Sequence, residues 1–176
     1  MTPIPTSPGV YALLLVLREA TTLKVDRLGE AHFPAGDYVY LGSARGPGGL
    51  RARLGRHLRS GKSRRGTSRP HWHIDYLRRR VDVYGYCYQV LHTGDHLDSL
   101  ECAWSQAVAA LPGAEIPLPR FGASDCRSGC AAHLAAFPRE GQNEKQIFAR
   151  LFPSPLASVF STASDVSAHA VVCNVR

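Results

Sequence analysis

The stretch YVYLGSARGPGGLRARLGRHL, residues Tyr38–Leu58, predicts a strand, a loop and a helix in immediate succession. Its opening Tyr-Val-Tyr-Leu-Gly is rich in aromatic and β-branched residues, which is typical of a strand. The glycines and the proline that follow predict a flexible loop. From Leu50 onwards apolar residues recur at helical spacing, with Leu50, Leu54 and either His57 or Leu58 on one face. Such a helix projects four arginines around its other sides: Arg51, Arg53, Arg56 and Arg59.

The sequence before this stretch predicts further strands. Val10–Leu17 is apolar and β-prone, with Pro-Gly in front and Arg-Glu behind, so we expect a core strand. Leu23–Val25 and Glu30–Phe33 flank Arg-Leu-Gly and predict a short hairpin, inserted at a sheet edge. Pro34–Asp37 then predicts a turn.

The sequence after it mixes helical and extended patterns. His71–Leu77 predicts a short helix or turn, and Val81–Leu91 alternates as a strand does. A helix is expected over Leu100–Leu111, with Asp98 or Ser99 as its N-cap and Pro-Gly at its end.

The last third of the chain has two textures. Ala131–Phe137 predicts one more apolar element, either a strand or a helix. After Pro138 the sequence becomes rich in Ser and Ala, and we expect little fixed packing there. We therefore predict one α+β domain followed by a largely flexible tail over residues 138–176.

The chain is basic, with 21 Lys and Arg against 14 Asp and Glu, a formal charge of +7 and a pI of about 9.5. More than half of these cations lie between Arg45 and Arg80, where Asp75 is the only acid. Such a patch favours a polyanionic partner, because each cation placed on a phosphate releases counterions. Many small basic proteins bind nothing in particular, but their charge is not gathered in one segment.

The cysteine content bears on the cellular compartment. Five cysteines, an odd number, argue against a disulfide framework and for a reducing compartment, so we expect a cytoplasmic protein. No apolar run is long enough to predict a membrane span. The apolar stretch near the N-terminus follows no basic leader and is interpreted as a strand, not as a signal peptide.

Short motifs occur along the chain in a defined order: GVY at Gly9–Tyr11, YLGSA at Tyr40–Ala44 and RARLGRHL at Arg51–Leu58. SLECAW at Ser99–Trp104 follows and puts Glu101 on a helix. With these motifs the chain resembles the GIY-YIG nuclease superfamily. It is more closely similar to a branch of uncharacterised GIY-YIG-like domains that in some archaea are fused to an endonuclease-III-type DNA glycosylase. Segments similar to that branch are Phe33–Ala44, His71–Leu77, Glu101-Cys102, Phe121–Cys126 and His133-Leu134.

The resemblance extends over residues 8–137 and implies an α+β domain with a small, mainly antiparallel β-sheet flanked by helices. It also implies metal-dependent hydrolysis of a nucleic-acid phosphodiester bond. Tyr11 would act as the base, with Tyr40 beside it. Arg53 would clamp the phosphate, and His57 would orient water or share in proton transfer. Glu101 would hold one hard cation, Mg²⁺ or Mn²⁺.

The resemblance also leaves two positions open. A further histidine serves near the active site of some superfamily members, and His71 or His73 is the candidate here, with Asp75 placed to fix its tautomer. The superfamily's usual asparagine near the end of the domain has no match, and Asp125 or Ser124 occupies that region.

The basic segment is expected to grip a nucleic-acid backbone without reading its sequence. DNA ranks ahead of RNA as the expected partner, and a DNA-repair enzyme is the expected protein partner. The residues assigned to backbone contacts are Arg45, Arg51, Arg56, Arg59, Lys62, Arg64, Arg65, His71 and His73.

A non-catalytic nucleic-acid-binding module is the rival interpretation. Taken one at a time, each matching residue also has an ordinary explanation. The tyrosines can be half-buried strand residues, Arg53 and His57 can contact phosphate without cleavage, and Glu101 can be a solvated helix residue. The two interpretations differ in geometry, because a nuclease needs its functional residues in one cleft and a binding module does not. The residues that must converge are Tyr11, Tyr40, Arg53 and Glu101.

The segment Cys126-x3-Cys130-x2-His133 has a spacing suited to zinc, and Cys102 is available as a fourth ligand. A domain built on that site would carry stoichiometric zinc. The alternative is a tight loop in which polar side chains hold backbone amides while free cysteines pack inside. Of the two, we favour the loop.

Overall fold

The structure, a computed structural model, describes residues 3–60, 70–92, 96–139, 160 and 171–175. Strand β1 (Gly9–Leu17) lies at its centre, and all of its residues are buried. A strand covered on both faces requires a continuous apolar run, which GVYALLLVL supplies. β4 (Gly36–Ala44) and β5 (Asp82–Val90) pair with β1 on its two sides, both antiparallel.

The main sheet has five strands in the order β6-β4-β1-β5-β7 and is antiparallel at each pairing. β6 (Leu134–Pro138) extends it beyond β4, and β7 (Val172–Val175) extends it beyond β5. β6 begins opposite Tyr40, and β4 continues to Ala44. The last residues of β4 therefore extend past the start of β6, which leaves room for side chains at that edge.

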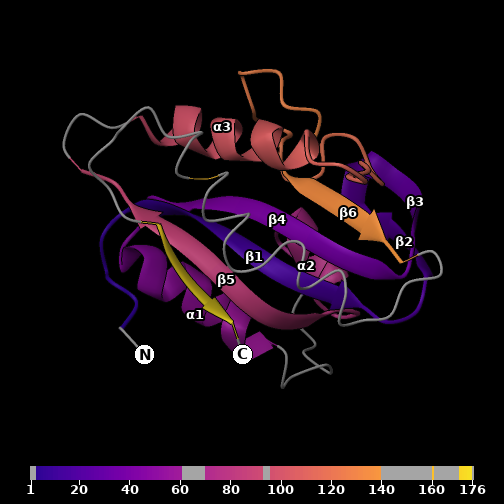
Figure 1. Cartoon of the computed structure of the whole chain (residues 1–176), viewed down its shortest axis with the longest axis horizontal. Coiled ribbons are helices and arrows are strands. Elements are labelled where there is room, and N and C mark those ends of the chain that lie inside the picture. Colours follow the sequence, from indigo (N-terminus) through magenta and orange to yellow (C-terminus); the bar gives the residue numbers. More distant parts are fainter. Residues whose placement is uncertain (1–2, 61–69, 93–95, 140–159, 161–170, 176) are drawn as a thin grey trace.

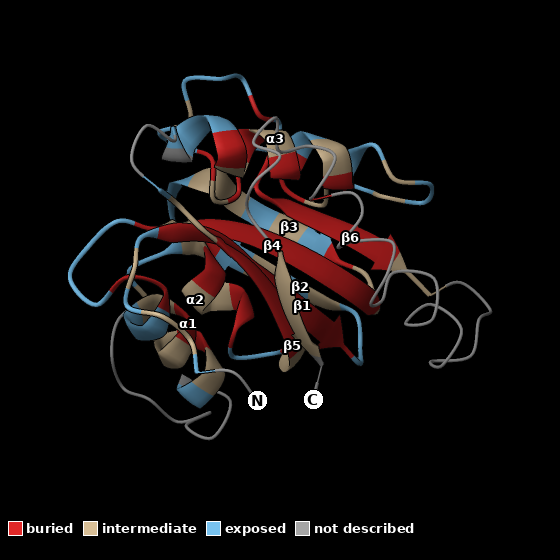
Figure 2. Ribbon diagram, turned by 60° about the vertical axis from the view of Figure 1, so that its left-hand side comes forward, coloured by how far each residue is buried: buried red, intermediate tan, exposed pale blue. Residues whose placement is uncertain are grey.

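Helices cover both faces of this sheet (Figure 1). Leu50 and Leu54 of α1 (Gly49–Ser60) and the buried residues of α2 (His73–Leu77) pack against one set of β1 side chains. Trp104 of α3 (Leu97–Ala109) packs against the alternate set. Because successive side chains of a strand point to opposite faces, the sheet builds two apolar layers. Figure 2 shows its strands as the buried centre between more exposed helices and loops.

The predicted hairpin forms a separate two-stranded sheet. It consists of β2 (Thr21–Val25) and β3 (Gly29–Phe33), joined by the 3-10 turn η1 (Asp26–Leu28). Its exposure alternates, and its buried Val25 and Phe33 join the apolar layer on the α1 side. The insertion between the GVY and YLGSA motifs thus leaves the β1–β4 pairing intact.

The predicted α+β class, with a mainly antiparallel sheet flanked by helices, is confirmed. Ala131–Phe137, for which the sequence allowed either a strand or a helix, contains most of the strand β6. The predicted cap of α3 is wrong. His96 is the N-cap residue and makes no side-chain cap bond, while Asp98 forms an ion pair with Arg45.

The described part of the tail is packed, contrary to the expectation of little fixed packing. β7 pairs with β5, and the ring of Phe160 stacks on Trp104 with centroids 3.9 Å apart. Most other residues of the tail lie outside the described ranges.

A disulfide links Cys87 of β5 to Cys173 of β7, which are directly opposite each other in the antiparallel register. The odd number of cysteines argued against a disulfide framework, and this one bridge departs from that expectation. Cys102, Cys126 and Cys130 are free thiols. Among the described residues no helix has the length and apolar character needed to span a membrane.

Candidate functional site

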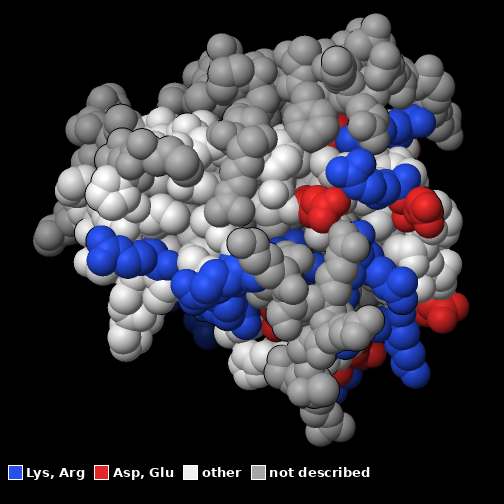
Figure 3. Space-filling view, turned by 90° about the horizontal axis from the view of Figure 1, so that it is seen from below, with Lys and Arg blue, Asp and Glu red and all other residues white. Residues whose placement is uncertain are grey.

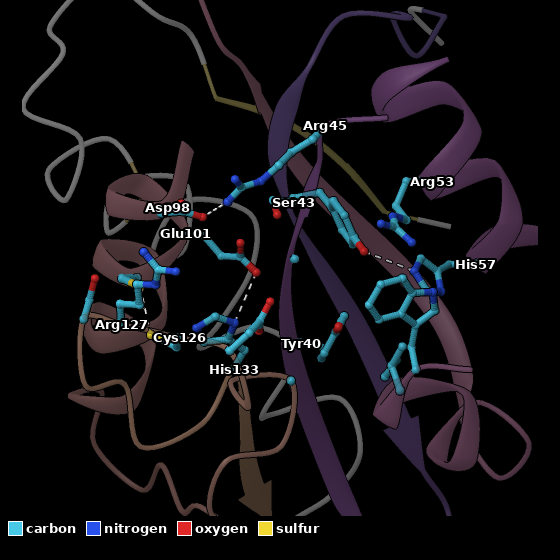
Figure 4. A pocket seen from close by; sticks show the side chains of 18 of the residues that line it. Tyr40, Ser43, Arg45, Arg53, His57, Asp98, Glu101, Cys126, Arg127 and His133 are labelled. Carbon is cyan, nitrogen blue, oxygen red and sulfur yellow. Dashed lines mark hydrogen bonds and ion pairs between the residues drawn. The ribbon is translucent and has the colours of Figure 1, made fainter. Parts of the chain in front are cut away.

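A cavity of about 640 Å³ opens beside the C-terminal end of β4. That end pairs with the first residues of β1. Figure 4 shows α1 on one side of β4 and α3 with the cysteine-containing loop on the other. The residues whose convergence separates a nuclease from a binding module all line this cavity: Tyr11, Tyr40, Arg53 and Glu101.

The two tyrosines are placed by the register of β1 and β4. Tyr11 is opposite Gly42, and Tyr40 is opposite Leu13, so the tyrosines are diagonal neighbours on one face. A β-carbon at Gly42 would lie 2.5 Å from the Tyr11 hydroxyl oxygen, a distance that excludes any side chain. The glycine of the YLG motif is therefore required by the close approach of the Tyr11 ring.

His57 reaches the same place from α1. Its Nε2 lies 3.1 Å from the hydroxyl oxygen of Tyr11, and its ring is 2% exposed. Burial, together with Arg56 and Arg78, lowers its pKa to about 3. A neutral imidazole has one ring nitrogen without a proton, so the tautomer of His57 that is protonated on Nδ1 lets Nε2 accept the hydrogen bond of the Tyr11 hydroxyl.

The tyrosines are held in their protonated form. Burial raises the pKa of Tyr11 well above its usual range, and Tyr40 and Glu101 raise it further. Burial and Glu101 also raise the pKa of Tyr40. Arg53 acts in the opposite direction on both groups. A buried tyrosinate is therefore disfavoured here unless more positive charge enters the cavity.

Cations and one exposed indole form the α1 side of the cavity. The guanidinium carbon of Arg53 lies 4.9 Å from the ring centroid of Trp72, in a cation–π contact. Trp72 is 43% exposed, although it precedes a buried Ile74. Arg56 forms an ion pair with Asp75, at 3.2 Å between Nη2 and Oδ1.

Glu101 enters from the other side of β4. Its side chain is 13% exposed, and its Oε1 forms an ion pair with Nδ1 of His133 at 3.1 Å. Figure 4 shows one carboxylate oxygen directed at His133 and the other turned away from it. Burial lowers the pKa of His133, but Glu101 and Cys126 together more than offset this, so the pKa is raised.

Neither histidine of the α2 segment lines the cavity, and that prediction is wrong. His73 turns away, and its Nδ1 accepts a hydrogen bond from the backbone N–H of Gly122 at 3.1 Å. His71 is exposed and packs edge-on against Trp72. Asp75 does not orient a histidine ring, because its Oδ2 accepts from the backbone N–H groups of His71 and Trp72. The helix start requires those bonds.

The other assigned cations divide into three groups. Arg45 and Arg56 line the cavity. Arg51 and Arg59 are exposed outside it, and Nε of Arg51 donates to the carbonyl of Ile4 at 2.9 Å. Figure 3 shows Lys and Arg side chains gathered in a band across one face of the molecule. Three assigned residues lie outside the described ranges: Lys62, Arg64 and Arg65.

Two residues that shape the site carry no sequence signal of their own. Trp72, to which no role was assigned from the sequence, lines the cavity. Arg78 was grouped with the surface cations, but it is buried and its Nη2 donates to the carbonyl of His57 at 2.7 Å. Nothing local distinguishes Arg78 from its neighbours. Of the two candidates for the missing asparagine, Asp125 lines the cavity.

The cysteine-containing loop forms the rest of the α3 side. Sulfur atoms of three residues and one ring nitrogen lie within 4.8 Å of one another, and they belong to Cys102, Cys126, Cys130 and His133. The four ligand candidates recognised in the sequence are therefore brought together. Soft thiolate and imidazole donors suit a transition metal, whereas Glu101 offers oxygen, which suits Mg²⁺ or Mn²⁺.

Searches among curated proteins and among solved structures returned no match. One family does match, the domain of unknown function DUF123, over residues 10–153. DUF123 is a GIY-YIG-like family, in agreement with the motifs that meet in the cavity. Since the match covers most of the chain, the protein belongs to the DUF123 family.

Proposed function

We propose that this protein is a metal-dependent endonuclease that hydrolyses phosphodiester bonds of nucleic acid, and that it acts on DNA in a repair or processing context. The observation that carries the proposal is the convergence of Tyr11, Tyr40, Arg53 and Glu101 in one cavity. These residues come from two strands and two helices on opposite sides of β4, so their meeting is not a by-product of a single element.

The α1 side of the cavity suits a bound phosphate. Arg53 and Arg56 both line it, and a planar guanidinium binds two oxygens of one phosphate. The face of Trp72 already contacts Arg53, and it is exposed enough to stack on an unpaired base. A nucleic-acid strand would then place its backbone against the arginines and a base near the indole.

Tyr11 and His57 support proton transfer from an attacking water. Burial opposes a free tyrosinate, but Tyr11 can accept the proton of water as it passes its own proton to Nε2 of His57. The net result is a protonated His57 and a neutral Tyr11. A phosphate anion on Arg53 and Arg56 would offset charges that lower the pKa of His57, so substrate binding would make His57 a better base.

Glu101 fits the role of cation ligand. Its carboxylate raises the pKa of both tyrosines, so it contributes negative charge to the cavity that a cation would neutralise. Mg²⁺ usually takes one or two carboxylates and completes its shell with water and phosphate oxygens. When bound, such a cation supplies charge stabilisation for the pentavalent phosphorus and the leaving oxygen.

The proposal is tested by cleavage of labelled branched, flapped and single-stranded DNA and RNA with Mg²⁺ or Mn²⁺. We expect the substitutions Tyr11→Phe, Arg53→Ala and Glu101→Gln each to lower the rate at saturating substrate by about 10²–10⁴-fold. Arg51→Ala is the matched control for Arg53, because Arg51 is on the same helix outside the cavity.

Binding measured in parallel separates the nuclease from the rival module. A nuclease should bind substrate with Glu101→Gln nearly as tightly as wild type while it fails to cleave. Tight, salt-sensitive binding without cleavage of any substrate, unaffected by Glu101→Gln, would instead identify a non-catalytic nucleic-acid-binding module.

A further inference from the structure

The cysteine-containing part of the loop between α3 and β6 lies outside the two large apolar layers. Residues 110–133 are all described, and they form neither helix nor strand apart from one isolated bridge at Glu115. Leu118 and Phe121 anchor the first half of this loop in the main core. The following part, by contrast, packs in a small cluster of one alanine, Ala123, with three cysteines, which is a weak reason for an irregular segment to adopt one conformation.

The same loop gathers soft metal ligands instead. Sγ of Cys102 lies 3.4 Å from Sγ of Cys126, and Sγ of Cys130 lies 4.0 Å from the carbonyl oxygen of Cys102. With Zn–S bonds of about 2.3 Å, the ligand atoms of a tetrahedral site are roughly 3.8 Å apart. The four donor atoms of the cluster, all within 4.8 Å of one another, require only small shifts to reach that geometry.

His133 supplies an independent observation. Its Nδ1 lies 3.1 Å from Oε1 of Glu101, and its buried ring also interacts with the side chain of Cys126, one of the candidate ligands. Metal-binding histidines usually direct one nitrogen at the metal and the other at a carboxylate. In His133 the Glu101 carboxylate takes Nδ1, which leaves Nε2 for a metal.

We propose that one zinc ion is bound in a closed structural site by Cys102, Cys126, Cys130 and His133. Three thiolates and one imidazole are a common ligand set of structural zinc, and a four-protein-ligand site leaves no open position for catalysis. The ion links α3 to the loop and to the start of β6, beside the bond that Ser105 donates to the carbonyl of Ala132 at 2.7 Å.

The zinc site also positions the cavity wall. Glu101 is adjacent to Cys102 in sequence and contacts His133, so it touches the site from two directions. Zinc on Nε2 leaves the proton of His133 on Nδ1, directed at the Glu101 carboxylate. Glu101 is thereby held against one side of the cavity, whatever reaction takes place there.

The first test is the metal content of the full-length protein, purified without chelators and measured by mass spectrometry of the elements. We expect about one zinc per chain. Cobalt added to the zinc-free protein should give the intense absorption of tetrahedral cobalt with thiolate ligands. Zinc far below one equivalent with no tetrahedral cobalt spectrum would overturn the proposal, and so would stoichiometric iron in place of zinc.

Cys126→Ser tests the ligand assignment, with Cys173→Ser as the matched control because Cys173 lies outside the cluster. We expect Cys126→Ser to weaken zinc binding by at least about 100-fold in competition with a chelator and Cys173→Ser to leave it unchanged. Equal zinc affinity in the two variants would refute the site. If Cys126→Ser does not fold, the cobalt spectrum of the wild type decides.

Glu101→Gln distinguishes this proposal from the nuclease. As the carboxylate partner of His133, Glu101 should contribute about 10–100-fold to zinc affinity, so Glu101→Gln should bind zinc more weakly. At saturating zinc the variant should bind the zinc ion again. If Glu101 also holds the Mg²⁺ or Mn²⁺ of the proposed nuclease, the variant should still fail to cleave. Stoichiometric zinc in a protein that cleaves no substrate would refute the nuclease alone. Cleavage by a protein that binds no zinc as purified or on addition would refute the zinc site alone.

Discussion

At the scale of single residues, His57 connects the candidate site to the hydrophobic core. It lies on a helix whose sequence is otherwise dominated by arginine and leucine, yet it is buried and hydrogen-bonded to the Tyr11 hydroxyl. Burial of a polar ring is tolerated only when its hydrogen bonds are made. The neutral form is therefore the one that the folded protein stabilises.

The stability of the protein should depend on pH through His57. Its pKa is lowered from about 6.5 to about 3 in the folded state, so between these values the unfolded chain binds the proton more readily. The free energy of unfolding should fall as the pH drops from about 6.5 toward 3, by up to a few kcal/mol.

His57→Gln removes this contribution, because glutamine can still accept from Tyr11 but does not titrate. Urea denaturation at several pH values should show a flatter acid limb for the variant than for wild type. Parallel acid limbs would mean that His57 takes up a proton in the folded protein.

At the scale of elements, α1 is oriented by a contact from outside it. Nη2 of Arg78 donates to the carbonyl of His57, and Nη1 donates to the carbonyl of Val81 at 3.1 Å. Arg78 thus connects α1 to the segment just before β5. Because Arg53 and His57 lie on this helix, the same contact holds both of them in the cavity.

The α3 layer depends on Phe160, which reaches it from the tail. Phe160 is fully buried against Trp104, so Phe160→Ala should lower the free energy of unfolding by about 3 kcal/mol through lost burial and a cavity. Phe160→Leu, which keeps much of the apolar volume, should cost less. Thermal or urea unfolding measures both. A loss for Phe160→Ala of less than about 0.5 kcal/mol would show that the ring is not packed there in solution.

At the scale of the whole molecule, charge should govern encounter with nucleic acid. The net charge of +7 is concentrated in one segment, although some of its arginines are engaged in ion pairs, as Arg56 is with Asp75. Ion-paired arginines contribute less to a phosphate contact, because their charge is partly neutralised before the ligand arrives. Arg53, which contacts an indole, keeps its full charge for a phosphate.

The affinity for duplex DNA should therefore fall steeply with salt. The plot of log affinity against log salt should lose about 0.9 of its slope in Arg53→Ala, the amount expected for one phosphate contact. Arg18→Ala is the control, because Arg18 follows the opposite end of β1 and pairs with Asp82. Equal slopes for wild type and Arg53→Ala would remove Arg53 from the phosphate contact.

The sequence by itself determined the elements from β1 to α3 and their order, because these depend on local periodicity and turn residues, whereas β6 was left open and β7 was not expected. The run Val10–Leu17 and the stretch Tyr38–Leu58 could be interpreted without any distant contact, and they place Tyr11, Tyr40 and Arg53 on predictable elements. Recognition of Glu101 depended on its motif, since a glutamate on a helix has no local sign of function.

Only the tertiary structure decided which side chains meet. The contact between Tyr11 and His57 joins residues 46 positions apart, and it follows from the register of β1 and the docking of α1. The same applies to the exclusion of His71 and His73, the gathering of the cysteines and the packing of Phe160. Local patterns report which face of an element is apolar, but a meeting of distant side chains depends on how the elements pack, which no short stretch of sequence contains.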